Sequence, residues 1–205
     1  MSVDERQKKL IRSLVIQPGR VGQELSTTEF LRQFPASVDE SKSLALRLLE
    51  DGLAKRDAEV IELGITSGFR FGMREAYIPL LERLAVEDFH FSHEDVVFKL
   101  GKLRSPTSVE PLFRASERRH EYLEYNDQYS LRSKIIHALG NIGTLEACSR
   151  LEELAQRFED PELIAKIGRR FRALVETSAS EEVRARARDA LSRLPPAPDD
   201  DDELA

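Results

Sequence analysis

The feature that most constrains the fold of this chain is an internal repeat. When the sequence is compared with itself at an offset of 39 residues, apolar and glycine positions coincide over two blocks. The coinciding positions are Val96 with Ile135, Val97 with Ile136, Leu100 with Leu139, Gly101 with Gly140, Leu103 with Ile142, Val109 with Cys148 and Leu112 with Leu151. A period of this length is typical of arrays in which each repeat buries its apolar face against its neighbours.

Two weaker copies flank these blocks. One lies 32 residues upstream, where Phe71, Tyr77, Pro79 and Leu80 match Leu103, Val109, Pro111 and Leu112. The other lies 28 residues downstream, where Leu163, Ile164, Ile167 and Gly168 match Ile135, Ile136, Leu139 and Gly140. Terminal repeats are often irregular because one of their faces meets solvent, and we therefore expect about four units in all.

The period of the apolar residues indicates that each unit is a pair of helices. Apolar residues recur at intervals of three and four, and the composition, with 33% charged and 7% aromatic residues and no Trp, favours solvated helices over a β-sandwich. Capping boxes mark helix starts at Ser26, Ser37 and Ser92, each with a carboxylate three residues later. The expected helices are 4–16, 28–34, 38–55, 57–71, 75–86, 93–103, 109–120, 130–142, 145–158, 162–175 and 181–193.

Two segments, HFSHEDVVFKLGKLRSPTSVEPLF and YLEYNDQYSLRSKIIHALGNIGTLEA, resemble the bacterial HEAT-repeat proteins that share features with phycobilin-lyase-type HEAT-like repeats. The resemblance covers residues 55–160, although many relatives carry Trp where this chain has Phe89 and His137. It implies an all-α fold, a right-handed α-solenoid of about four HEAT-like helix pairs. We expect an N-terminal helical cap over residues 1–55, the repeats over 56–194 and a disordered acidic tail over 195–205.

Several classes of protein are disfavoured by composition. A single cysteine, Cys148, can form neither an intramolecular disulfide nor a cysteine zinc site, which favours a reducing compartment. The N-terminal residues carry charges of both signs before a short apolar run, so we expect no signal peptide. No stretch approaches the ~18 consecutive apolar residues of a membrane span. The expectation is a cytoplasmic protein that does not associate with membranes.

The strongest candidate for a functional surface is the segment from Arg119 to Arg132, the longest connection between repeat helices. Its tyrosines and acids are Tyr122, Tyr125 and Tyr129 with Glu121, Glu124 and Asp127. Tyrosine offers a large rigid contact area with a polar tip, and the carboxylates suit Arg or Lys on a partner. The alternative is that the rings pack between two repeats with their hydroxyls bonded locally.

A second cluster, His90, His93, Glu94 and Asp95, has residue types that suit zinc or manganese. A solvated helix start explains the same residues, because Asp95 is the capping carboxylate of Ser92 and acids favour the first turn. Helical spacing does not require the two histidines to converge. We therefore predict no metal site, and we expect His93 and Glu94 to contribute to partner binding beside the tyrosine-bearing segment.

Nothing in the sequence marks catalysis or a cofactor. Cys148 matches Val109 in the repeat and is expected to be a buried apolar residue, while His137 matches Phe98 and is expected to be partly buried in packing. No glycine-rich phosphate motif follows a strand. The sequence therefore predicts a protein that is not an enzyme and needs no cofactor, although the fold alone leaves phycobilin-lyase-like tailoring as an alternative.

The charge distribution leaves a nucleic-acid binder or DNA-repair protein as another alternative. Residues 161–194 carry eight Lys or Arg and five acids, whereas five acids in the last seven residues account for most of the formal net charge of -6. Against this alternative, Arg184, Arg186 and Arg188 do not share one helical face, and Glu182 is placed to pair with Arg186. The favoured function is a non-catalytic protein-binding module. Some small HEAT proteins resemble immunity proteins that neutralise a bacterial toxin by occlusion, which makes a cognate toxin the most concrete partner.

Overall fold

The computed structural model describes residues 4–14, 25–34 and 38–195, and all regular structure in these ranges is helical. An all-α fold is therefore confirmed for the described part of the chain. The α-helices are α1 (Glu5–Arg12), α2 (Thr27–Gln33), α3 (Val38–Lys55), α4 (Ala58–Phe71), α5 (Ile78–Leu84), α6 (His93–Leu103), α7 (Val109–Ser116), α8 (Tyr129–Ile142), α9 (Leu145–Arg157), α10 (Pro161–Thr177) and α11 (Glu181–Arg193). Short 3-10 helices are η1 (Glu75–Tyr77), η2 (Pro106–Ser108) and η3 (Glu121–Asn126).

The helix starts follow the local capping chemistry of the sequence. Ser26 accepts a hydrogen bond from the Glu29 backbone N–H at 3.2 Å, and α6 begins at His93, directly after Ser92. The third predicted cap, Ser37, lies outside the described residues, as does the tail from residue 196. The main difference from the expected helices is at 109–120, because α7 ends at Ser116 and a separate 3-10 helix follows.

The chain divides into two compact units at Val96 and Val97. In the first unit α3 packs along α4, and α1 contacts both α2 and α4. Its apolar core is formed by the buried side chains of Ile11, Leu14, Phe30, Phe34, Leu44, Leu48, Val60 and Leu63. Glycine permits the close contact of α3 with α4, since a Cβ at Gly64 would lie 2.7 Å from a Leu49 methyl carbon.

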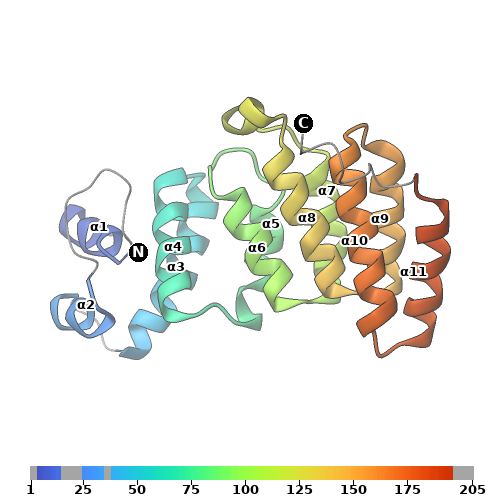
Figure 1. The fold of residues 1–205 in the computed structure, drawn as a ribbon. Coiled ribbons are helices and arrows are strands. Elements are labelled where there is room, and N and C mark those ends of the chain that lie inside the picture. Colours follow the sequence, from blue (N-terminus) through green and yellow to red (C-terminus); the bar gives the residue numbers. More distant parts are fainter. Residues whose placement is uncertain (1–3, 15–24, 35–37, 196–205) are drawn as a thin grey trace, which may run out of the picture. The chain divides into compact units, whose positions relative to one another are not determined.

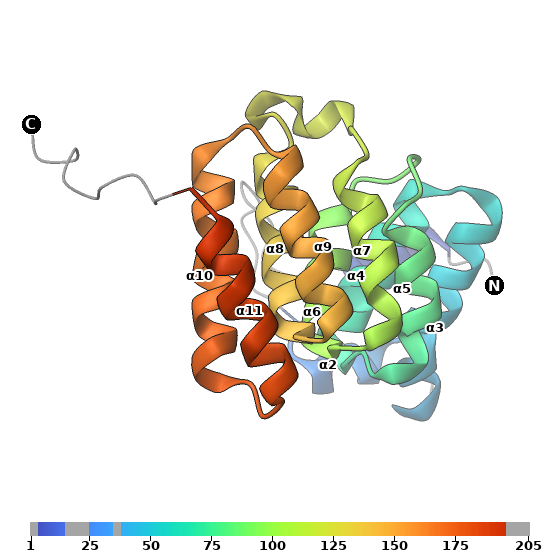
Figure 2. The ribbon, with the colours of Figure 1, turned by 90° about the vertical axis from the view of Figure 1, so that its right-hand side faces the viewer.

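In the second unit the helices form two layers. One layer contains α6 from Val97 onward, α8 and α10, and the other contains α7, α9 and α11; Figures 1 and 2 show α8 and α10 side by side on one side of α7 and α9. We call these the first and second layers. Two glycines at matching repeat positions allow close approach within the first layer: a Cβ at Gly101 would lie 2.9 Å from the Ala138 backbone, and one at Gly140 would lie 2.5 Å from the Arg170 side chain.

The domain limits and the solenoid arrangement remain predictions. Among the residues that the structure describes, no helix is both long and apolar enough to cross a bilayer.

Candidate functional site

The tyrosine-bearing segment forms a projecting loop in the second unit, seen as the yellow-green segment at the top of Figures 1 and 2. We call residues 117–128 the tyrosine loop. It leaves α7 after Ser116, forms the 3-10 helix η3, and enters α8 at Tyr129. Loops carried by rigid elements are frequent sites of recognition.

A buried amide holds the two ends of this loop together. The His120 backbone N–H donates to Gln128 Oε1 at 3.0 Å, and Gln128 Nε2 donates to the His120 carbonyl oxygen at 2.9 Å. Both residues are buried, so the Gln128 side chain takes the place of the backbone partner that a strand or helix would supply. The loop is therefore a closed structure with a defined base.

The base also contains backbone conformations that cost free energy. Asp127 has φ 47° and Gln128 has φ 63°, so two successive non-glycine residues lie in the left-handed region. Each such residue costs on the order of 1 kcal/mol, and strain of this kind is found preferentially at binding and active sites. Asp127 is held by ion pairs to Arg119 at 2.8 Å and to Arg132 at 3.5 Å.

The three tyrosines occupy different environments. Tyr125 is 79% exposed, the highest exposure among the large hydrophobic side chains that the structure describes as exposed, and Glu124 and Asp127 are exposed beside it in the sequence. Tyr122 is half-buried, with its ring centroid 5.9 Å from that of His120. Only Tyr125 therefore offers most of its surface to a partner.

Tyr129 belongs to the packing of α8 on α10 and not to the loop tip. Lys166 lies 5.4 Å from its ring centroid, and the hydroxyl is hydrogen-bonded to Glu162. Desolvation, followed by this carboxylate, raises the pKa of Tyr129 to about 12. The alternative interpretation, in which a tyrosine packs between repeats, thus fits Tyr129, whereas the interface interpretation fits Tyr125.

A polar groove of about 220 Å³ lies at the foot of the loop. Its walls are Arg119, Asp127, Arg132, Arg157, Phe158, Glu159, Asp160 and Leu163. The Arg132 guanidinium stacks 5.4 Å from the Phe158 ring centroid, which fixes one wall. Charges of both signs line this groove, so it suits polar side chains of a protein surface better than an apolar ligand.

The two histidines converge, although helical spacing does not require it. In the first unit, the rings of His90 and His93 stack with centroids 4.0 Å apart, and both side chains are buried. His90 Nε2 donates to the Leu84 carbonyl at 2.9 Å while its Nδ1 accepts from the Ser92 N–H at 3.1 Å. Both nitrogens of His90 are thus occupied, and the pair closes the turn that leads into α6.

The sequence predicted two of the residues in this region, His93 and Glu94, as partner contacts. His93 has no exposed surface and its Nε2 contacts the Glu87 carbonyl at 2.7 Å, so contact with a partner would require the ring to leave its position. Glu94 is half-buried in the first turn of α6. Within the described residues no cluster of three or more His, Cys, Asp or Glu side chains has the geometry to hold a metal ion.

The sequence also made predictions for two other titratable residues, Cys148 and His137, of which the first is confirmed and the second is wrong. Cys148 is fully buried, and desolvation raises the pKa of its thiol to about 11, so the expected apolar packing role is confirmed. His137 is exposed on α8 and not buried, because the apolar stripe of that helix runs through Ile135, Ile136 and Leu139 on the opposite side. Partial desolvation and the cations of α10 lower the pKa of His137.

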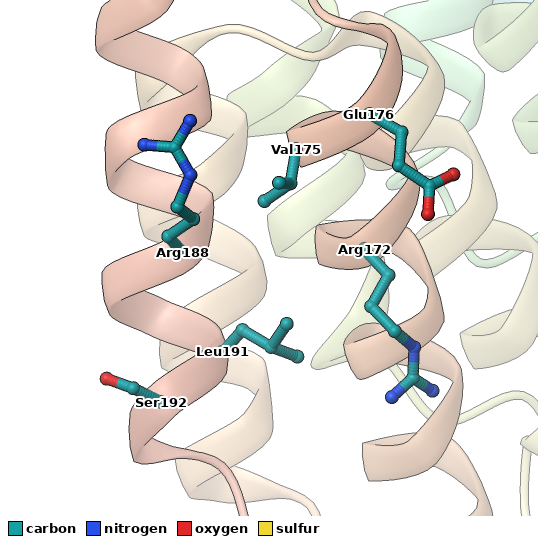
Figure 3. A pocket seen from close by; sticks show the side chains of 6 residues that line it. All are labelled: Arg172, Val175, Glu176, Arg188, Leu191 and Ser192. Atoms are coloured by element: carbon teal, nitrogen blue, oxygen red, sulfur yellow. The ribbon is translucent and has the colours of Figure 1, made fainter.

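A further groove of about 290 Å³ lies between α10 and α11. Figure 3 shows Val175 and Leu191 pointing toward each other across it, with Arg172, Glu176 and Arg188 around them. An apolar floor with a charged rim can hold a side chain of a partner. The six residues that line the groove include one acid, Glu176, and one hydroxyl, that of Ser192, which donates to the Asp189 carbonyl.

Comparison with known proteins gives no relative from which a role could be transferred. The chain matches no protein-family model, no curated protein and no solved structure. The fold and the loop thus define an all-helical protein with a projecting, internally braced segment, and its function must be argued from these features.

Proposed function

We propose that this chain is a non-catalytic protein-binding module whose partner contacts the tyrosine loop. The observation that carries the proposal is the presentation of Tyr125, which is 79% exposed in η3, within a loop whose base is closed by the Gln128–His120 hydrogen bonds. Tyrosine and arginine are enriched among residues that dominate binding energy, and a pre-ordered loop loses little conformational entropy on association.

The finer architecture is part of the same proposal. We infer that the helix pairs form a right-handed solenoid of about four HEAT-like repeats behind an N-terminal cap. The two-layer packing of the second unit and the glycines at matching repeat positions support this view. A solenoid presents an extended surface and seldom carries chemistry of its own, in keeping with a role in binding.

The most concrete form of the proposal is an immunity-type protein that occludes a bacterial toxin in the cytoplasm. Occlusion requires shape and charge complementarity and no cofactor. Glu124 and Asp127 next to Tyr125 would suit a partner with Arg or Lys at the contact. Co-expression with the product of the neighbouring gene, and then with other candidate toxins, should rescue growth and yield a complex.

Tyr125→Ala tests the site in any complex so obtained. Loss of a central tyrosine should weaken binding by about 2 kcal/mol, or about 30-fold, without a change in melting temperature. Phe91→Ala is the matched control, because Phe91 is a 70% exposed aromatic residue in the first unit. Equal weakening by both variants, or a lower melting temperature for Tyr125→Ala, would contradict the assigned interface.

A further inference from the structure

The two layers of the second unit differ sharply in charge. The first layer, α6 from Val97 with α8 and α10, contains eight Lys or Arg and two acids, whereas the second layer, α7, α9 and α11, contains seven of each. Glu94 and Asp95, the other acids of α6, lie in its first turn in the first unit. The formal charge of -6 for the whole chain hides this separation.

In the second layer most arginines pair with carboxylates of the same or a neighbouring helix. Arg150 of α9 pairs with Glu110 of α7 at 2.7 Å. Arg186 and Arg193 of α11 both pair with Glu152 of α9, at 2.5 and 2.6 Å. The predicted pair of Glu182 with Arg186 is therefore replaced by a contact between helices. These arginines serve the packing of the layer and leave little net charge for a ligand.

Several cations of the first layer lack such partners, although Arg132 of α8 pairs with Asp127 at 3.5 Å. Within the described part of the chain, Lys102 and Arg169 have no carboxylate within ion-pair distance, and the buried Nε of Arg170 has no hydrogen-bond partner. Lys166 contacts Glu162 only at 3.6 Å. The cations of α10 also lie close enough to His137 on α8 to lower its pKa, after desolvation as the larger cause. Positive charge thus accumulates across adjoining helices.

We call the exposed surface of the first layer the basic face. Two neighbouring grooves lie on it. One of about 230 Å³ between α6 and α8 is lined by Phe98, Gly101, Lys102, Lys134, His137, Ala138 and Asn141. The other, of about 310 Å³ between α8 and α10, includes Arg104 and Arg170 in its lining. Phe98 is 46% exposed beside Lys102, so an aromatic face stands among the cations. Each groove combines two or more cations with polar donors.

We propose that this basic face binds the phosphate backbone of a nucleic acid. Lysine is depleted in protein–protein interfaces but is, with Arg, Ser and Asn, a usual contact of phosphate oxygens. Adjacent helices pack about 9 Å apart, so three helices span about 18 Å, enough for several successive phosphates of a strand. Phe98 supplies a surface on which a base can stack. This surface is separate from the tyrosine loop and does not depend on the proposed protein partner.

Binding of a labelled oligothymidylate of about ten nucleotides to the full chain tests the proposal. For about four phosphate contacts on a single strand, affinity should fall about 50-fold between 50 and 200 mM salt. The double variant Lys102→Gln/Arg169→Gln should bind more weakly and should lose only about sevenfold over the same range, since two contacts are removed. Phe98→Ala should weaken binding with the salt dependence unchanged.

The matched control is Arg114→Gln/Arg118→Gln, which removes two exposed cations on α7 and just after it. It should bind as the parent does, and circular dichroism should show all variants folded. Equal weakening by the control would mean that net charge alone is responsible and would overturn the assignment. Equal binding of a poly-glutamate peptide, with the same sensitivity to Lys102→Gln/Arg169→Gln, would instead make the face a docking site for acidic proteins. Tyr125→Ala should leave oligonucleotide binding intact, so the two proposals can fail separately.

Discussion

Gln128→Ala removes the side chain that closes the base of the tyrosine loop. In the parent, this amide accepts from the His120 N–H and donates to the His120 carbonyl, in a site where Gln128 itself has no exposed surface. The substitution leaves the buried His120 N–H without this partner, whereas the His120 carbonyl keeps its hydrogen bond from the Leu123 N–H at 2.9 Å. It leaves the left-handed backbone at residue 128 unchanged, because alanine meets the same steric penalty there.

The size of the effect follows from the cost of buried polar groups. Each backbone group left unpaired costs about 1–3 kcal/mol, and water entering the opened loop recovers part of this cost. Because only the His120 N–H loses its partner, we expect Gln128→Ala to lower the free energy of unfolding by about 1–3 kcal/mol. The matched control is Gln156→Ala on the exposed side of α9, which should change stability by no more than about 0.5 kcal/mol.

Urea denaturation followed by circular dichroism measures this difference, and hydrogen exchange at the His120 amide locates it. In the parent that amide should be protected, and in Gln128→Ala it should exchange quickly even where the helices remain folded. A change in stability below about 0.5 kcal/mol together with a protected His120 amide would show that the loop does not depend on this side chain. Tyr125 would then not be pre-ordered by the Gln128 side chain.

Four further outcomes test other parts of the structure. Folding raises the pKa of Tyr129 from its ordinary value to about 12. The stabilisation that this shift provides is therefore complete below about pH 10 and is lost as the pH rises to about 12, so the melting temperature should fall over this range. Tyr129→Phe should abolish this part of the fall in melting temperature. Cys148 should react with a thiol reagent only when urea unfolds the chain, and rapid labelling of the native protein would contradict its burial. Gly101→Ala should lower the free energy of unfolding by about 1–3 kcal/mol, whereas Gly168→Ala, with ordinary contacts at 3.6 Å, should be neutral or stabilising by up to about 1 kcal/mol in the same urea titration. Deletion of residues 196–205 removes five acids and should strengthen oligonucleotide binding at low salt without moving the melting temperature.

The helices were predictable because their signals are local. The expected helix at 181–193 and the observed α11 have the same bounds, and Ser180 caps α11 with a hydrogen bond from the Val183 N–H at 3.3 Å. The end of α7 was not predictable in this way. No Gly or Pro follows Ser116 to mark a helix end, and the loop closes through the contact of His120 with Gln128, eight residues apart, for which no turn motif exists.

The candidate site was predictable in place but not in detail. The density of tyrosine and acid marked the correct loop, yet only the structure separates Tyr125, which is exposed, from Tyr129, which is committed to α10. The side of α8 to which His137 points depends on a rotation of the helix by a few tens of degrees. A repeat alignment that matched His137 with Phe98 therefore identified equivalent positions correctly, since both are exposed, but assigned the wrong burial.

Charge was the property that the sequence concealed most. Counting residues 161–194 as one basic segment combined α10 with α11, although these helices lie in different layers and the α11 arginines pair with Glu152 or Glu181. Once the paired arginines of this segment are set aside, the cations that remain belong to α10, and Lys102 of α6 and Lys134 of α8 line a groove in the same layer. A stretch of sequence rich in basic residues therefore does not by itself form a basic surface. Successive helices of the second unit alternate between the two layers, so a ligand on one face contacts every second helix. The charge that such a ligand meets is therefore the sum over the helices of one layer, not over a continuous stretch of sequence.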